Sequence, residues 1–312
     1  MERRKAGVIG YPLAHSVSPA FQQPAFDHLG LHVSYKAYET PPERLAEFVT
    51  GLRDAGWLGC NVTIPHKQAI VGLMDAVTEE ARLIGAVNTV IREPDGRLTG
   101  HNTDAAGFLR ALEADAGFDP AGQPAVLLGA GGAALAVGVA LLRTGVSQLS
   151  IANRSPARAE SLAQVLGQAF PGARITTLGL DAEALRRPLA EAALLVNSTS
   201  VGMAHGPAPD RSPVPADALG PHLLVYDLVY NPARTPLLEA AAAAGARVQE
   251  GLPMLIYQGA LSFERWTGRP APVELMLVHG RRALRASSAF HPPHGGSPQS
   301  PVPSPESADL GL

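Results

Sequence analysis

Three short polar segments in the first 104 residues carry side chains that could bind and transform a small molecule. Together they offer hydroxyls, amides, an ammonium and a carboxylate. Each segment falls where a strand is expected to end or a helix to begin, and ligands of α/β proteins bind at such positions. This combination of groups suits a polyhydroxylated acid. The segments are GYPLAHSVSP at 10–19, NVTIPHK at 61–67, and GAVNT at 85–89 followed by GHNTD at 100–104.

Lysine is rare in the chain and therefore informative where it occurs. The 312 residues contain 22 arginines but only Lys5, Lys36 and Lys67. An exposed cation can be either type, so a lysine that remains suggests that an ammonium is wanted. We interpret Lys5 and Lys36 as ordinary surface residues. The residues alone leave two interpretations of Lys67 and Asp104 open: a reactive pair, or a solvated lysine and a helix N-cap.

A glycine-rich turn in the middle of the chain predicts a dinucleotide site. It lies between an apolar run at 125–128 and an apolar helix expected at 133–142. Glycine there permits a tight turn and lets a pyrophosphate approach a helix N-terminus. Gly129 and Gly131 fill two positions of G-x-G-x-x-G, and Ala134 fills the third. The candidate cofactor residues are Gly129, Ala130, Gly131, Gly132 and Ala133.

The end of the next expected strand favours NADP over NAD. An NAD site places an acid about 20 residues beyond the glycines, on the ribose 2′-hydroxyl. Here the strand ends in Asn153, Arg154 and Ser155, and Arg158 follows, with no acid before Glu160. Guanidinium groups suit a 2′-phosphate. The alternative is that both arginines are ordinary surface residues.

Composition excludes several classes of protein. A formal net charge of −3 with 17% charged residues does not favour a nucleic-acid partner. The single Cys60 excludes an intramolecular disulfide and a cysteine-based metal cluster. His15 and His66 lack the spacing of metal ligands, so no metal is expected. We expect no signal peptide, no membrane span and a cytoplasmic location.

Alternating strands and helices predict an α/β fold with largely parallel sheets. We expect strands at 6–9, 33–37, 59–64, 125–128, 149–152, 193–196, 223–226 and 247–249, a hairpin at 88–91 and 97–100, and helices at 18–29, 43–55, from 67, 105–114, 133–142, 156–166, 235–244, 254–266 and 272–286. At 312 residues, two domains are expected. The tail at 287–312 holds six prolines and little apolar material, which predicts disorder.

The polar segments resemble those of the shikimate dehydrogenase family, in the family's order and over nearly all of residues 5–285. The strings NSTSVGM at 197–203, YDLVY at 226–230 and GLPML at 251–255 with Gln258 continue the resemblance. It implies an N-terminal α/β substrate domain (1–104, completed by helices in 252–286) and a Rossmann-type, doubly wound NADP-binding domain (105–251). It also implies reversible reduction of 3-dehydroshikimate to shikimate, a step in aromatic amino-acid biosynthesis.

The resemblance assigns roles residue by residue. Lys67 and Asp104 match the family's catalytic pair, and lysine suits a ketone reduction because its ammonium can stabilise the oxygen and exchange a proton. Ser16 and Ser18 match carboxylate-binding hydroxyls, although Ser18 could equally cap a helix. Tyr230 matches a substrate position, although it could simply pack. The ring-hydroxyl contacts are Thr63, Asn88 and Gln258. The nicotinamide contacts are Thr199, Met203 and the backbone of Gly251, and Leu228 is a further cofactor-binding residue.

The chain departs from the family pattern at a few positions. His101 stands at the variable position of G-x-N-T-D, Pro253 replaces a frequent glycine, and Gln22-Gln23 replaces a frequent His-Asn. Two other functions stay open: a quinate/shikimate dehydrogenase with broader cofactor use and a non-catalytic NADP-binding sensor. Ser18 and Arg154 argue against the first of these. The expected assembly is a monomer or homodimer.

Overall fold

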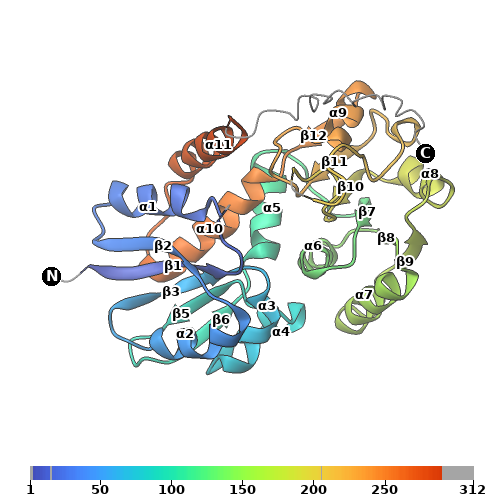
Figure 1. The fold of residues 1–312 in the computed structure, drawn as a ribbon. Coiled ribbons are helices and arrows are strands. Elements are labelled where there is room, and N and C mark those ends of the chain that lie inside the picture. Colours follow the sequence, from blue (N-terminus) through green and yellow to red (C-terminus); the bar gives the residue numbers. More distant parts are fainter. Residues whose placement is uncertain (1–2, 15, 205, 290–312) are drawn as a thin grey trace, which may run out of the picture.

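The computed structural model describes residues 3–14, 16–204 and 206–289 and contains two six-stranded sheets, one in each half of the chain (Figure 1). The first sheet has the order β2-β1-β3-β5-β6-β4 and the second the order β12-β11-β10-β7-β8-β9. The second order is that of a doubly wound dinucleotide-binding fold. The α/β prediction with a Rossmann-type second half is confirmed.

The first sheet is mixed. Strands β1, β2 and β3 are parallel, whereas β5 pairs antiparallel with both β3 and β6. The β5–β6 hairpin was predicted from the turn residues Pro94, Asp95 and Gly96. The strands are β1 Arg4–Gly10, β2 Val33–Glu39, β3 Trp57–Val62, β4 Ala76–Val77, β5 Thr89–Arg92 and β6 Leu98–His101.

The second sheet is entirely parallel and is covered on both faces. Along β7, Ala125 and Leu127 belong to one buried apolar cluster, and Val126 and Leu128 belong to the cluster on the opposite face. Continuous apolar runs are typical of such strands. The strands are β7 Pro124–Leu128, β8 Gln148–Asn153, β9 Ile175–Gly179, β10 Leu194–Asn197, β11 Leu224–Asp227 and β12 Arg247–Gln249.

Eleven α-helices connect and cover the sheets within the described residues. Ser18 opens α1 with Pro19 in its first turn, and Pro156 and Pro236 occupy the first turns of α7 and α9. The helices are α1 Ser18–His28, α2 Leu45–Gly51, α3 His66–Ala69, α4 Glu79–Ile84, α5 Asp104–Ala114, α6 Gly132–Arg143, α7 Pro156–Ala169, α8 Ala182–Glu191, α9 Pro236–Ala243, α10 Leu252–Thr267 and α11 Val273–Ala289.

The last two helices return to the first half of the chain. Helix α11 packs against α1, and α10 packs along α5, between the two sheets (Figure 1). Gly107 permits this close approach, because a Cβ there would lie 2.7 Å from the backbone nitrogen of Gln258. The packing brings Gln258 to the start of α5.

Some elements differ from expectation. The helix expected at 43–55 is a 3₁₀ turn at Pro42–Arg44 followed by the short α2. The expectations omitted β4, α4, β9 and α8. Helix α11 extends to Ala289, beyond the expected start of the tail at residue 287, and residues 290–312 lie outside the described part of the chain.

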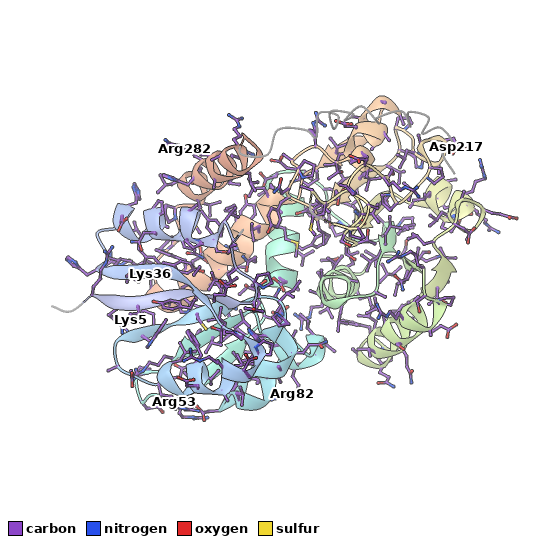
Figure 2. The ribbon with its side chains drawn as sticks, viewed as in Figure 1. Lys5, Lys36, Arg53, Arg82, Asp217 and Arg282 are labelled. Atoms are coloured by element: carbon purple, nitrogen blue, oxygen red, sulfur yellow. The ribbon has the colours of Figure 1, made fainter. Side chains whose placement is uncertain are left out.

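Lys5 and Lys36 lie on β1 and β2 and are exposed, as Figure 2 shows. Lys5 Nζ lies 6.0 Å from the centre of the Trp57 ring. Among the described residues, no helix is long and apolar enough to cross a membrane, and no group of three or more His, Cys, Asp or Glu side chains is arranged to hold a metal ion.

Candidate active site

One cavity of about 190 Å³ brings together seven of the eight predicted catalytic and substrate residues. Five come from strand ends and helix starts in the first half of the chain, Tyr230 comes from the loop after β11, and Gln258 comes from α10. Ser16 lines an adjoining cavity of about 320 Å³, which shares Ser18, Thr63 and Tyr230 with the first. His15, in the same segment, lies outside the described residues. The seven are Ser18, Thr63, Lys67, Asn88, Asp104, Tyr230 and Gln258.

Lys67 and Asp104 form an ion pair at the wall of this cavity. Lys67 Nζ donates to Asp104 Oδ2 at 2.7 Å, and the two side chains are 33% and 12% exposed. Lys67 stands in the first turn of α3, just beyond β3, and Asp104 is the first residue of α5. An ammonium has three donors and Asp104 takes one, so Lys67 can also donate to a ligand oxygen.

Asn88 fixes the other carboxylate oxygen. Its Nδ2 donates to Asp104 Oδ1 at 2.8 Å, to Thr103 Oγ1 at 2.9 Å and to Gln258 Oε1 at 3.2 Å. Its Oδ1 accepts from Thr103 N at 2.8 Å, which sets the orientation of the amide. Because both oxygens of Asp104 are held, the carboxylate has a defined direction toward the cavity. Asn88 therefore positions Asp104 as well as facing the cavity.

Sequence reasoning missed a buried polar network beneath the cavity. Asn61, which also lines the cavity, donates through Nδ2 to Ser262 Oγ at 2.8 Å, and its Oδ1 accepts from Tyr35 Oη at 2.8 Å. Thr89 Oγ1 lies 2.7 Å from Ser262 Oγ and donates to Asn88 Oδ1 at 3.0 Å. Burial raises the pKa of Tyr35, which keeps it a donor. Asn61 opens the NVTIPHK string, and that position was the available signal.

Three of the four residues that depart from the family pattern, Gln22, Gln23 and His101, have hydrogen-bond partners. Gln22 Nε2 donates to Gly259 O at 2.8 Å, and Gln23 Oε1 accepts from Tyr35 N at 2.7 Å, so both glutamines bind neighbouring elements. Arg265 Nε donates to His101 Nδ1 at 3.3 Å. Burial, followed by the Arg265 charge, lowers the pKa of His101, which favours the neutral ring.

The glycine-rich turn has the geometry that a dinucleotide requires. Gly129 has φ +106°, and a Cβ there would lie 2.6 Å from Ser198 Oγ. Gly131 caps α6 and Gly132 begins it, and a Cβ at either would meet no protein atom within 4 Å. Open space above a helix N-terminus can receive a pyrophosphate. These residues fit the predicted group, and Ala130 lies between them.

Arg154 directly follows β8, and Arg158 lies in the first turn of α7. Arg154 and Arg158 are exposed, and neither forms an ion pair with a described carboxylate. Asn153 Nδ2 donates to Ser155 O at 3.0 Å, which shapes the turn before α7. Guanidinium groups without internal partners are available to a phosphate.

The predicted cofactor residues divide into two groups. Ala133, Leu228 and Gly251 line the same cavity as Lys67 and Asp104. The other cofactor residues do not line it and lie around the carboxyl ends of β7, β8 and β10, with Met203 37% exposed. These are Gly129, Ala130, Gly131, Gly132, Asn153, Arg154, Ser155, Arg158, Thr199 and Met203.

Three family models match successive parts of the chain. The shikimate dehydrogenase substrate binding domain matches residues 8–90, the shikimate / quinate 5-dehydrogenase model matches residues 113–203, and the shikimate 5′-dehydrogenase C-terminal domain matches residues 251–277. Together these models cover most of the chain.

Individual proteins are similar over nearly their whole length. The shikimate dehydrogenase (NADP(+)) of Methanopyrus kandleri is 50% identical over 276 residues, which cover 88% of this chain and 94% of that protein. The shikimate 5-dehydrogenase of Thermus thermophilus, solved in complex with NADP(H) and shikimate, is 43% identical with a TM-score of 0.80, covering 90% and 99% of the two chains. A quinate dehydrogenase from Corynebacterium glutamicum, in complex with NAD, is 31% identical with a TM-score of 0.83, covering 90% and 100%.

Proposed function

The chain belongs to the shikimate dehydrogenase family, and from this membership we propose that it catalyses the reversible, NADP-dependent reduction of 3-dehydroshikimate to shikimate. One observation carries the proposal. The Lys67–Asp104 pair lines a single cavity together with Ala133, Leu228 and Gly251, the residues assigned to the cofactor. A substrate held at the pair would therefore lie beside the nicotinamide, as hydride transfer requires.

The chemistry of the pair follows from its geometry. NADPH, when bound, supplies the hydride. Lys67 would donate to the ketone oxygen and stabilise the charge that develops there. Asp104, held by Asn88, would orient the ammonium and accept a hydrogen bond from a substrate hydroxyl. Because Nζ and Oδ2 lie 2.7 Å apart, both groups would lie close to the ketone oxygen that gains the proton.

The remaining cavity residues divide by chemistry. Ser16 and Ser18 would donate to the substrate carboxylate, Thr63 would contact a ring hydroxyl, and Tyr230 would contact the substrate. Gln258 Nε2 donates to Leu255 O at 2.7 Å and its Oε1 accepts from Asn88, which leaves one N–H and one lone pair for a ring hydroxyl. The matching motifs suggest these roles, and the positions of the residues around two adjoining cavities support them.

Arg154 and Arg158, which form no ion pair with a carboxylate in the described part of the chain, support NADP as the cofactor. Arg154 and Arg158 would bind the 2′-phosphate, with Asn153 and Ser155 shaping the turn. The N-terminus of α6 would face the pyrophosphate, and Thr199 and Met203 would approach the nicotinamide.

We propose that residues 1–104 with the helices of 252–286 form the substrate domain, and that 105–251 form the NADP-binding domain. We also propose a cytoplasmic location and an assembly that is a monomer or a homodimer. Light scattering of the purified protein would measure its assembly.

A comparison of four substrate and cofactor combinations tests the function. Purified protein is assayed for reduced nicotinamide with shikimate or quinate and with NADP⁺ or NAD⁺. We expect the highest kcat/KM for shikimate with NADP⁺. A preference for quinate or NAD⁺ would favour the broader quinate/shikimate dehydrogenase, and absence of turnover in every combination would favour the non-catalytic sensor.

A further inference from the structure

Asp227 is a buried carboxylate that the mechanism above does not use. It is the last residue of β11, its exposed fraction is 0%, and no described cation forms an ion pair with it. Burial raises the pKa of Asp227 to about 6, opposed by hydrogen bonds from Thr235, Val229 and Asn197. Burying a carboxylate is costly. A buried carboxylate without an ion-pair partner is therefore informative, and the groups that donate hydrogen bonds to Asp227 indicate what it does.

The first partner connects Asp227 to the loop after the neighbouring strand. Asn197, also 0% exposed, ends β10 opposite Asp227 and donates from Nδ2 to Asp227 Oδ1 at 2.9 Å. Its Oδ1 accepts from Thr199 N at 3.0 Å and from Thr199 Oγ1 at 2.7 Å. The acceptor Asp227 thus sets which way the Asn197 amide points, and the amide in turn holds Thr199.

The other partners fix the loop after β11. Val229 N donates to Asp227 Oδ1 at 3.0 Å, and Thr235 Oγ1 donates to Asp227 Oδ2 at 2.7 Å. Thr235 is also the N-cap of α9, where its Oγ1 accepts from Leu238 N. The carboxylate therefore holds both ends of the loop 228–235. That loop carries Leu228 and Tyr230, which line the cavity.

The two loops also touch each other away from the carboxylate. Ala204 N donates to Asn231 O at 2.9 Å, and a Cβ at Gly202 would lie 3.3 Å from Thr235 Cβ. The first loop reaches the glycine-rich turn as well, because Ser198 Oγ donates to Leu128 O at 2.6 Å. Asp227 lies at the centre of this assembly, where both loops leave the sheet.

We infer that Asp227 is a positioning residue that fixes the loops 197–203 and 228–235 relative to each other, so that the nicotinamide and the reacting carbon meet at the right distance. The inference rests on the proposed function, which assigns Thr199 to the nicotinamide and Tyr230 to the substrate. Asp227 itself touches neither ligand and acts through Asn197 and the backbone of Val229. A fault of about 1 Å in such positioning can reduce the rate of reaction about 10²-fold.

Two variants, one on each side of the hydrogen bond between Asn197 and Asp227, test the inference. Asp227→Ala removes the carboxylate, whereas Asn197→Asp replaces the donor and places two carboxylates against each other. For both we expect kcat for shikimate oxidation to fall about 10²-fold. Asp227→Asn keeps the shape and an acceptor for Asn197 and Val229, so it should restore most of kcat.

A fragment of the cofactor separates positioning from general damage. Adenosine 2′,5′-bisphosphate would bind the glycine-rich turn and Arg154 but lacks the nicotinamide that would contact Thr199 and Leu228. Calorimetric titration should therefore give the same Kd for the wild type, Asp227→Ala and Asn197→Asp, while kcat falls. Circular dichroism records whether each variant is folded, and if Asp227→Ala does not fold, Asn197→Asp alone decides.

Three results would overturn the inference. Wild-type kcat in Asp227→Ala or Asn197→Asp would show that the link does not matter. A Kd for the fragment that weakens in parallel with kcat would show a general structural role, as would failure of Asp227→Asn to restore kcat. An inactive wild type that still binds the fragment would instead refute the proposed function, and the inference would fall with it.

Discussion

Replacing Lys67 with alanine tests the chemistry of the cavity most specifically. The change removes the ammonium 2.7 Å from Asp104 Oδ2 and leaves the other cavity side chains in place. Loss of a proton donor or of an oxyanion partner costs about 10² to 10⁴ in rate. At about 1.4 kcal/mol for each tenfold change, the barrier should rise by about 3 to 5 kcal/mol. The KM for shikimate should change little, because the interaction is made mainly in the transition state.

Steady-state kinetics with shikimate and NADP⁺ measures both constants. Lys36→Ala is the matched control, because Lys36 is exposed on β2 and should retain wild-type kcat. Lys67→Arg keeps a cation that stays protonated and cannot readily give up a proton, so its kcat should stay well below that of the wild type. If Lys67→Ala retains wild-type kcat, or loses affinity for shikimate without losing kcat, the assignment is wrong.

Three further changes probe the cofactor end, a buried carboxylate and the packing that completes the cavity. Arg154→Ala should raise the KM for NADP⁺ about tenfold or more, since a charged hydrogen bond contributes about 1.5–3 kcal/mol, and should leave the KM for NAD⁺ unchanged. Equal effects on the two KM values in steady-state kinetics would argue against a 2′-phosphate contact. Burial raises the pKa of Asp227 from 3.8 to about 6, so its contribution favours the folded state at low pH and is lost as pH rises through 6. The free energy of unfolding of the wild type relative to Asp227→Asn should therefore fall by up to about 3 kcal/mol between pH 4 and 7, and a constant difference in urea denaturation would contradict this. Gly107→Ala should lower kcat and thermal stability together, because its Cβ would lie 2.7 Å from the backbone of Gln258 and must move α10; an unchanged Tm would exclude that contact.

Local sequence signals were sufficient for most elements but weak for short ones. The hairpin of β5 and β6 was predictable because Pro94, Asp95 and Gly96 mark its turn. Helix α4 was missed because six residues give little periodicity. Its boundaries did carry signals: Thr78 caps it by accepting from Ala81 N, and Gly85 ends it at φ +64°.

The site was predictable where its residues sit in one string and less so where they meet across the chain. Lys67 follows β3 within a single motif. Asn88 and Gln258 are 170 residues apart in the sequence, and they come together only because α10 packs on α5. The role of Asn88 in holding Asp104 depends on this packing. Asp227 stood in a motif, but its partner Asn197 on the neighbouring strand became visible only with the sheet register.

The transfer of hydrogen from shikimate to the cofactor tests the central claim most directly. Shikimate deuterated at the carbon that becomes the ketone is incubated with the purified protein and NADP⁺, and the nucleotide is analysed by mass spectrometry. We predict reduced NADP that carries the deuterium, because the substrate at Lys67 and Asp104 would lie beside the nicotinamide in one cavity. Failure to form reduced NADP, or reduced NADP without deuterium, would contradict direct hydride transfer by this protein.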